Sequence, residues 1–161
     1  MIRKATENDP ITLDQLARKV ADNLHRIGID QWSGVYPNQA NFQSDLQKGG
    51  LFVYVKGDHI VASISILEAL DEVYLSIPWK KSHSAAIHRL MVDPNHMHEG
   101  IGTELMRFAI DHIKASGYES IKVDTHPDNF RMKSLLIRFG FVPSGYLVPI
   151  NRDAFELVFE E

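Results

Sequence analysis

The segment Gly100-Ile101-Gly102-Thr103 has the composition of an anion-binding turn. It follows an apolar run that ends at Val92-Asp93-Pro94, and it precedes a stretch of helical apolar spacing. The first turn of a helix has unpaired backbone N–H groups and partial positive charge, and glycines let a phosphate approach the main chain. Two glycines also permit a tight turn without any ligand, so both interpretations stay open at this point.

Histidines and acidic residues cluster in this segment and in a second one further along the chain. They are His96, His98, Glu99, His126 and Asp128. A His-x-His pair suits zinc, which makes a metal site an alternative. Because the same loop would have to enclose phosphates if it binds an anion, we expect no metal here.

A second segment, Asp124 to Asn129, follows the next apolar run, and a helical stretch then ends at Gly140-Phe141. With these motifs the second half of the chain resembles the GNAT acetyltransferase superfamily. In that superfamily a strand ending in Val-x-Pro leads to Arg/Gln-x-x-Gly-x-Gly/Ala at the start of a long helix. An Asn and a helix ending in Gly-Phe follow. Val92-Asp93-Pro94, Gly100-Ile101-Gly102, Asn129 and Gly140-Phe141 occur in that order.

The resemblance implies that acetyl-CoA is the co-substrate. It also implies which of these motifs contacts each part of the coenzyme. The main chain at the end of the strand would pair with the pantetheine arm and polarise the thioester carbonyl. The turn would wrap the pyrophosphate, and Asn129 would bond the pantetheine or the acetyl end. The implied binding residues are Leu90, Met91, Val92, His98, Glu99, Gly100, Ile101, Gly102, Thr103 and Asn129.

Two positions depart from the superfamily pattern. Met97 occupies the place of the motif's Arg/Gln, so a phosphate contact there would come from the main chain alone. Leu136 occupies the place of a tyrosine that usually protonates the departing thiolate. The resemblance therefore supports coenzyme binding more directly than any particular proton chemistry.

His88 and Asp124 are the candidate catalytic residues. His88 lies four residues before Val92, beside the implied thioester position, and Asp124 ends the next strand. Histidine titrates near neutral pH, and burial can tune a carboxylate upward, so either can act as a base. A half-buried strand histidine and a carboxylate that caps a turn are the ordinary alternatives. His126 is a weaker candidate, because a His-Pro loop is usually exposed.

Two hypotheses for the function follow. In the first, the protein transfers an acetyl or other acyl group from acetyl-CoA to a primary amine on a small molecule or a protein, by direct attack on the thioester. In the second, it is an acyl-CoA-binding or sensory domain without turnover. Consumption of acetyl-CoA in the presence of amines separates the two.

The elements that position these residues are predicted from periodicity and from turn residues. Helices are expected at 12–27, 39–47, 100–116 and 129–139, and strands at 1–4, 51–55, 59–67, 84–92, 120–125, 141–148 and 154–159. The segment from Glu68 to Ser84, which holds Tyr74 and Trp79, has no clear pattern. The aromatics Trp32, Tyr36, Tyr74 and Trp79 can wall an acceptor pocket or simply pack in the core.

This order predicts a mixed α/β (α+β) GNAT-like fold, with a twisted mixed sheet of six or seven strands and about four flanking helices. The hairpin at 51–67 should be antiparallel, and the strands flanking the helix at 100–116 should pair in parallel. Without a repeat, linker or low-complexity tract, residues 1–161 are expected to form a single domain.

Composition excludes several other classes. The 161 residues include no cysteine, which removes disulfides and thiolate chemistry. The net charge of −4 gives no basic surface, so we expect neither nucleic-acid nor membrane binding. The start of the chain lacks the apolar region of a signal peptide, which favours a cytoplasmic location. A homodimer is possible by resemblance to the superfamily.

Overall fold

The structure, a computed structural model, describes residues 1–160 and contains one seven-stranded mixed sheet. The strands lie in the order β1-β2-β3-β4-β5-β7-β6. Their bounds are Ile2–Lys4, Leu51–Lys56, His59–Glu68, Ser84–Val92, Ser120–Thr125, Val142–Leu147 and Arg152–Val158, in order of number. The helices are α1 (Asp9–Arg26), α2 (Gln39–Gln47), α3 (Ile101–Ala115) and α4 (Phe130–Arg138). The predicted fold class and element order are confirmed.

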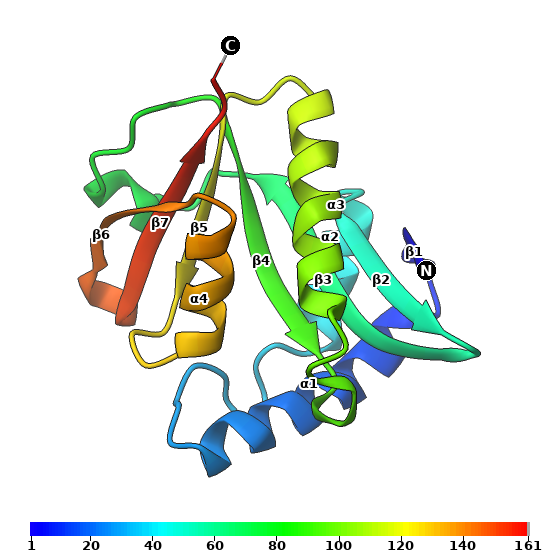
Figure 1. Cartoon of the computed structure of the whole chain (residues 1–161). Helices are drawn as coiled ribbons and strands as arrows, with labels where there is room; N and C mark the ends of the chain where they lie inside the picture. Colours follow the sequence, from blue (N-terminus) through cyan, green and yellow to red (C-terminus); the bar gives the residue numbers. More distant parts are fainter. Residues whose placement is uncertain (161) are drawn as a thin grey trace.

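Helices cover both faces of the sheet (Figure 1). On one face, α3 and α4 bury a core that includes Leu105, Ile113 and Leu136 against β3, β4 and β5. On the other face, α1 and α2 pack Leu13 and Phe42 against β2 and β4. The apolar stripe of each helix therefore finds an apolar strand face, as amphipathic spacing requires.

Most element bounds lie within a few residues of the expected ones. α2 and β5 have the predicted bounds, and Asn38 caps α2 by accepting from the N–H groups of Ala40 and Asn41. α1 begins three residues earlier than expected, at Asp9. Pro10 lies in its first turn, where the backbone N–H that proline lacks would have no partner within the helix. The proline therefore belongs to the helix instead of preceding it.

The segment between β3 and β4 forms no strand. It contains the short 3₁₀ helix η1 (Glu72–Ser76) and packs on the sheet through Tyr74 and Ile77. Trp79 donates its indole N–H to the Tyr74 carbonyl at 2.7 Å, and its ring lies 5.1 Å from the Lys122 ammonium. These contacts hold the segment against the sheet, where it packs on Ala86 of β4 and contacts Lys122 of β5.

The pairing of β4 with β5 is parallel, as expected, but short. It covers Ser84–Ala86 on β4 and Ser120–Lys122 on β5. β4 continues to Val92 and β5 to Thr125, so the two strands separate into a fork. β7 lies between β5 and β6 and pairs antiparallel with both, which keeps the sheet continuous beyond the fork.

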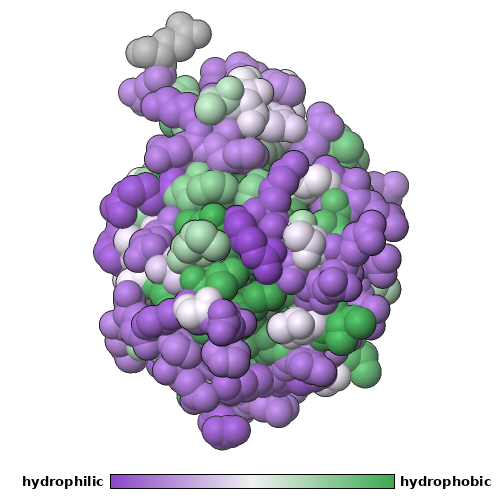
Figure 2. Space-filling model, turned by 90° about the vertical axis from the view of Figure 1, so that its right-hand side faces the viewer, coloured by the Kyte–Doolittle hydropathy of each residue, from purple (hydrophilic) through white to green (hydrophobic). Residues whose placement is uncertain are grey.

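Figure 2 shows the molecule from the side of the β1–β2 edge. Hydrophilic residues form most of this face, and hydrophobic ones gather toward its centre. Within residues 1–160, none of the helices combines the length and apolarity that crossing a membrane requires.

Candidate active site

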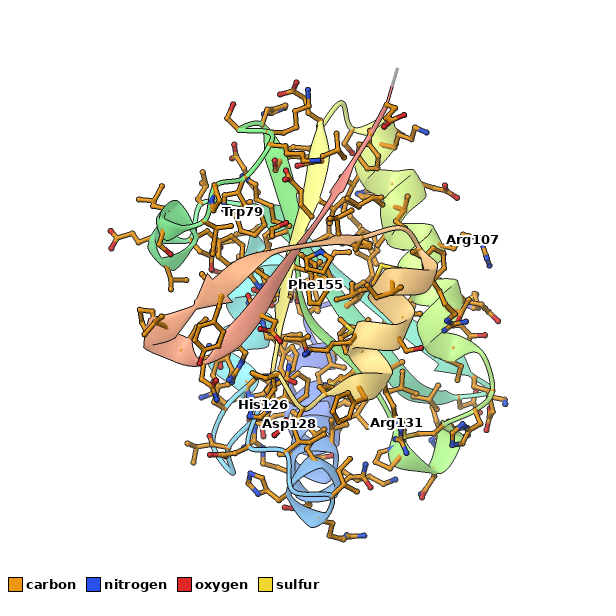
Figure 3. All side chains as sticks on the ribbon, turned by 60° about the vertical axis from the view of Figure 1, so that its left-hand side comes forward. Trp79, Arg107, His126, Asp128, Arg131 and Phe155 are labelled. Carbon is orange, nitrogen blue, oxygen red and sulfur yellow. The ribbon has the colours of Figure 1, made fainter. Side chains whose placement is uncertain are left out.

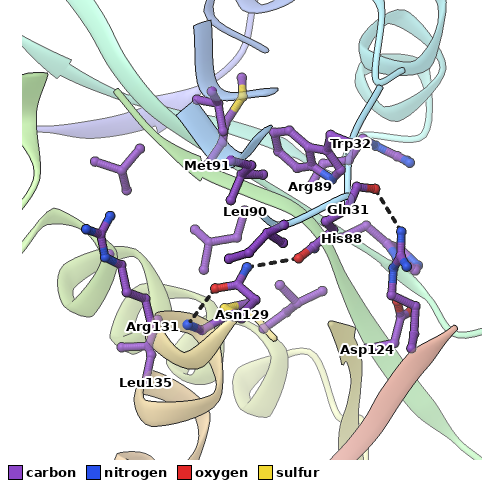
Figure 4. A pocket seen from close by; sticks show the side chains of 18 of the residues that line it. Gln31, Trp32, His88, Arg89, Leu90, Met91, Asp124, Asn129, Arg131 and Leu135 are labelled. Atoms are coloured by element: carbon purple, nitrogen blue, oxygen red, sulfur yellow. Dashed lines mark hydrogen bonds between the residues drawn. The ribbon is translucent and has the colours of Figure 1, made fainter. Parts of the chain in front are cut away.

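A cleft of about 2050 Å³ opens where β4 and β5 separate. Its walls come from the segment between α1 and α2, from β4 residues 87–92, from the turn before α3, and from α4. Figure 4 shows these walls from close by, with Leu90 of β4 lying between Met91 and Asn129, the residue that caps α4. Because β5 no longer pairs with β4 here, the β4 main chain on this side faces the cleft.

His88 and Asp124 lie across the fork from each other. The last paired positions are Ala86 and Lys122, so His88 and Asp124 are each two residues further along their strands. Side chains two residues apart in a strand share one face of the sheet. Both residues line the cleft. The structure therefore brings together the two candidate catalytic residues.

Each of the two has a partner from the segment around η1. The Tyr74 hydroxyl donates to Asp124 Oδ2 at 2.5 Å, and Asp71 Oδ1 lies 3.4 Å from His88 Nε2. Burial, and then the Asp124 carboxylate, raise the pKa of Tyr74 well above its ordinary value. The hydrogen bond with His88 lowers the pKa of Asp71. Tyr74 is thus a neutral donor to Asp124, and Asp71 an ionised partner of His88.

The turn before α3 has the backbone conformation that its glycines suggest. Gly100 is the N-cap residue, with φ of 81°, and His98 also has a positive φ, of 65°. The Glu104 N–H bonds to the Gly100 carbonyl at 3.0 Å, so the N–H groups of residues 101–103 precede the first bond of the helix. Apart from Glu99, the residues from His98 to Thr103 line the cleft.

Glu99 is oriented differently from the rest of the turn. Its carboxylate pairs with the Lys56 ammonium of β2 and lies 3.2 Å from His96 Nδ1. These contacts lower the pKa of Glu99. The side chain is therefore neutralised outside the cleft, and only its main chain follows the path of the turn.

Asn129 lies in the cleft wall with both ends of its amide engaged. Its Oδ1 caps α4 by accepting from the Met132 N–H at 3.2 Å. Its Nδ2 donates to Gln31 Oε1 at 2.9 Å. Gln31 is a site residue that the sequence did not indicate. Its main-chain carbonyl also accepts from Arg152 at 2.7 Å, so it ties the segment after α1 to the ends of β5 and β7.

An ion pair with a buried carboxylate and a partly buried guanidinium holds the strand that faces the cleft. Ser63 pairs with Met91 and Ser65 with His88, so β4 has one extra residue here and forms a bulge. Within it Arg89 has φ of 51°, an uncommon conformation for a side-chain-bearing residue. The Arg89 guanidinium donates to both oxygens of Asp45, at 2.7 and 2.6 Å. Although burial opposes it, this contact raises the pKa of Arg89.

Asp45→Asn should lower the free energy of unfolding by about 3 kcal/mol, because it removes the only carboxylate paired with the partly buried Arg89 guanidinium within residues 1–160. Asp45 is 1% exposed and also accepts from Ser65 Oγ at 2.6 Å. Urea unfolding measures the effect. Glu119→Gln is the control, because its pair with Lys81 is exposed, and we expect a change of under about 0.5 kcal/mol. Equal effects of the two variants would contradict a structural role for Asp45.

The two departures from the superfamily motif have different surroundings. Leu136 is fully buried in the core beneath α4, so its position holds no proton donor. Met97 lines the cleft at the turn, and its sulfur lies 2.8 Å from Arg131 Nη1. The place of the motif's Arg/Gln is therefore in contact with an arginine from another element.

His126 is not exposed, contrary to the expectation for a His-Pro loop. It is 8% exposed, and its Nδ1 accepts from the Asp128 N–H at 3.1 Å, which closes the turn between β5 and α4 (Figure 3). Among the described residues, no group of three or more His, Asp or Glu side chains is arranged to hold a metal ion.

The fold and the cleft together define a class of protein. Its members have a mixed sheet that forks at its parallel strand pair, with a glycine turn at the mouth of the fork. Residues 21–141 match the family model described as acetyltransferase (GNAT) family. This chain therefore belongs to the GNAT acetyltransferase family.

Individual relatives agree with this assignment. The chain is 26% identical over 141 residues to YesJ of Bacillus subtilis, named as an uncharacterized N-acetyltransferase, covering 85% of this chain and 78% of the relative. A GNAT acetyltransferase of Streptococcus agalactiae has a similar structure, with a TM-score of 0.88 at 21% identity over 100% of this chain and 96% of the other. The PaiA N-acetyltransferase of Thermoplasma acidophilum, solved with coenzyme A, matches with a TM-score of 0.78 at 16% identity over 99% and 98% of the chains.

Proposed function

We propose that this protein transfers an acetyl group from acetyl-CoA to a primary amine by direct attack on the thioester. The observation that carries the proposal is the fork. It exposes the β4 main chain at residues 87–92 along a cleft that has a glycine helix start at one end and His88 and Asp124 at the other. A strand edge can pair with an extended amide-containing arm, and a helix start suits its phosphates.

The residues of the cleft fit such a co-substrate. The β4 edge offers N–H and C=O groups to the pantetheine amides, and the N–H groups of residues 101–103 offer donors to the pyrophosphate. A Cβ placed on Gly102 would lie 3.9 Å from the nearest side-chain atoms, of Val92 and Leu135, so the position leaves room at the helix start. We propose Leu90, Met91, Val92, His98 to Thr103 and Asn129 as the binding residues.

His88 is proposed as the general base. We assign the ring proton of His88 to Nε2, because that nitrogen lies 3.4 Å from Asp71 Oδ1. The lone pair of Nδ1 is then the one that takes the proton of the amine. The amine nitrogen attacks the thioester carbon, an N–C bond forms, and the C–S bond breaks with its electron pair leaving on sulfur. The Asp71 carboxylate stabilises the imidazolium that results. His88 takes the first proton of the ammonium. After attack the nitrogen still carries a second surplus proton, which passes through water to the thiolate and leaves a neutral amide and the CoA thiol.

Asp124 is proposed to bind the amine instead of accepting its proton. Its carboxylate already accepts from Tyr74, which stays neutral, and it remains in the cleft wall opposite His88. Before deprotonation a primary amine is a cation, and a carboxylate at the fork would hold it against the thioester. Asp71, which contacts His88, adds a second negative charge at the fork.

Turnover tests the proposal. Purified protein is incubated with acetyl-CoA and a panel of primary amines that includes polyamines, amino-acid amides and peptides with free amino termini. We expect release of the CoA thiol that depends on the amine, with a matching acetylated product by mass spectrometry. Failure to bind acetyl-CoA at all would contradict the proposed function.

A second candidate function is acyl-CoA binding without turnover. Leu136 favours it, because the position that usually carries the proton-donating tyrosine is a fully buried leucine. Binding of acetyl-CoA with no amine-dependent release of thiol across the whole panel would support this alternative over the first.

A further inference from the structure

The turn that precedes α3 has few cationic side chains of its own. Residues 93–103 contain neither lysine nor arginine, and Met97 stands where the motif has Arg or Gln. Both acidic side chains of the turn are paired: Asp93 with Lys19 at 2.8 Å and Glu99 with Lys56. The turn therefore offers mainly N–H groups to an anion, with little charge.

Two arginines of α4 contact the turn at its two ends. Arg131 Nη1 lies 2.8 Å from Met97 Sδ, and Arg138 Nη2 lies 3.5 Å from Thr103 Oγ1. They are seven residues apart, or about two helical turns, so both project from the same face of α4. Both line the cleft. In Figure 4 Arg131 lies at the opposite side of the pocket from Asp124.

Neither guanidinium is neutralised by a carboxylate within residues 1–160. A thioether sulfur and a hydroxyl are weak or neutral acceptors, so the contacts with the turn leave the positive charges uncompensated. A guanidinium binds phosphate oxygens through parallel N–H bonds, which gives it both charge and geometry for this ligand.

We propose that Arg131 and Arg138 bind the phosphate groups of the acyl-CoA and supply the charge that the turn lacks at Met97. This inference rests on the proposed function, because it assigns these side chains to the same co-substrate. It extends the binding site from the turn to α4. It also gives the cleft opposite charges at its two ends, with arginines at the turn and carboxylates at the fork.

Arg107 provides a matched control. It is an exposed arginine on α3, and its guanidinium lies 5.5 Å from the centre of the Phe139 ring. It is absent from the residues that line the cleft. Figure 3 shows Arg107 at the outer side of α3 and Arg131 near the turn. The three arginines thus differ in position and not in charge.

The experiment is calorimetric titration of the wild type, Arg131→Gln, Arg138→Gln, the double variant and Arg107→Gln with CoA. We expect each α4 variant to raise Kd about tenfold and the double variant about 100-fold, as for hydrogen bonds to charged groups. Arg107→Gln should change Kd less than about twofold. Raising the salt concentration should weaken binding more for the wild type than for the double variant.

Competition by pantetheine, which has no phosphate, separates phosphate binding from a structural effect. The α4 variants should bind pantetheine as the wild type does. Unchanged CoA affinity in both variants, or an equal loss of pantetheine and CoA, would overturn the inference while leaving the proposed function intact. A wild-type protein that binds no CoA would instead contradict the proposed function itself.

Discussion

Gly102→Asp should abolish binding of acetyl-CoA and leave the protein folded. Gly102 lies in the first turn of α3 and lines the cleft, so a carboxylate there would face the proposed pyrophosphate. Two like charges about 4 Å apart repel by about 4 kcal/mol near a protein surface, enough for a loss of at least about 100-fold in affinity. Calorimetry with acetyl-CoA measures the loss, and circular dichroism the fold.

Two further variants separate charge from bulk at this position. Gly102→Ala adds a Cβ that would meet only ordinary contacts, at 3.9 Å from Val92 and Leu135, and an alanine in a helix is more stable than glycine by about 0.5–1 kcal/mol. Gly102→Asn has the size of the aspartate without its charge. We expect the affinity to fall in the order Ala, Asn, Asp. If Gly102→Asp bound acetyl-CoA with unchanged affinity, the proposal that the turn binds the pyrophosphate would be wrong.

His88→Ala should lower kcat by about 100-fold or more, the usual range for loss of a general base. Asp124→Ala should act differently, mainly raising the KM of the amine, because Asp124 is proposed to hold the cationic acceptor. Initial rates at several pH values, with the amine and acetyl-CoA varied in turn, distinguish the two effects.

Controls for this prediction lie close by in the structure. His83 precedes β4, stacks on Tyr118 at 4.8 Å between ring centres, and is not among the cleft residues, so His83→Ala should leave kcat unchanged. Tyr74→Phe removes the hydroxyl that donates to Asp124 and leaves His88 and its partner Asp71 unchanged. If His88→Ala and Asp124→Ala both slow turnover by less than about tenfold, both assignments are wrong.

The elements of the fold could largely be predicted from the sequence because their signals are local. Apolar spacing along α3, the cap at Asn38, and the glycines after helices each depend on residues a few positions apart. The parallel pairing of β4 and β5 also followed from a strand, helix and strand in succession. The segment from Glu68 to Ser84 resisted prediction because its residues are placed by tertiary packing of Tyr74 and Ile77, and they follow no period.

The candidate site could be predicted only in part, because only some of its residues have a local signal in the sequence. The turn, Asn129, His88 and Asp124 are marked by motif order and by their distance from strand ends. Arg89 and Asp45 had a weaker signal, a charged residue within a strand and an acidic one on the buried face of a helix. Gln31 had none, because nothing near it in the sequence reveals that it bonds to Asn129.

The sequence by itself determined the family resemblance, the order of the elements, and which residue types stand at the turn and at the ends of β4 and β5. The tertiary structure alone decided that β4 and β5 separate after Ala86, and that His88 and Asp124 then face one cleft. It also decided the partners: Asp45 and Arg89 are 44 residues apart, Tyr74 and Asp124 are 50, and Gln31 and Asn129 are 98. Such pairs form when packed elements meet, and no local pattern encodes them.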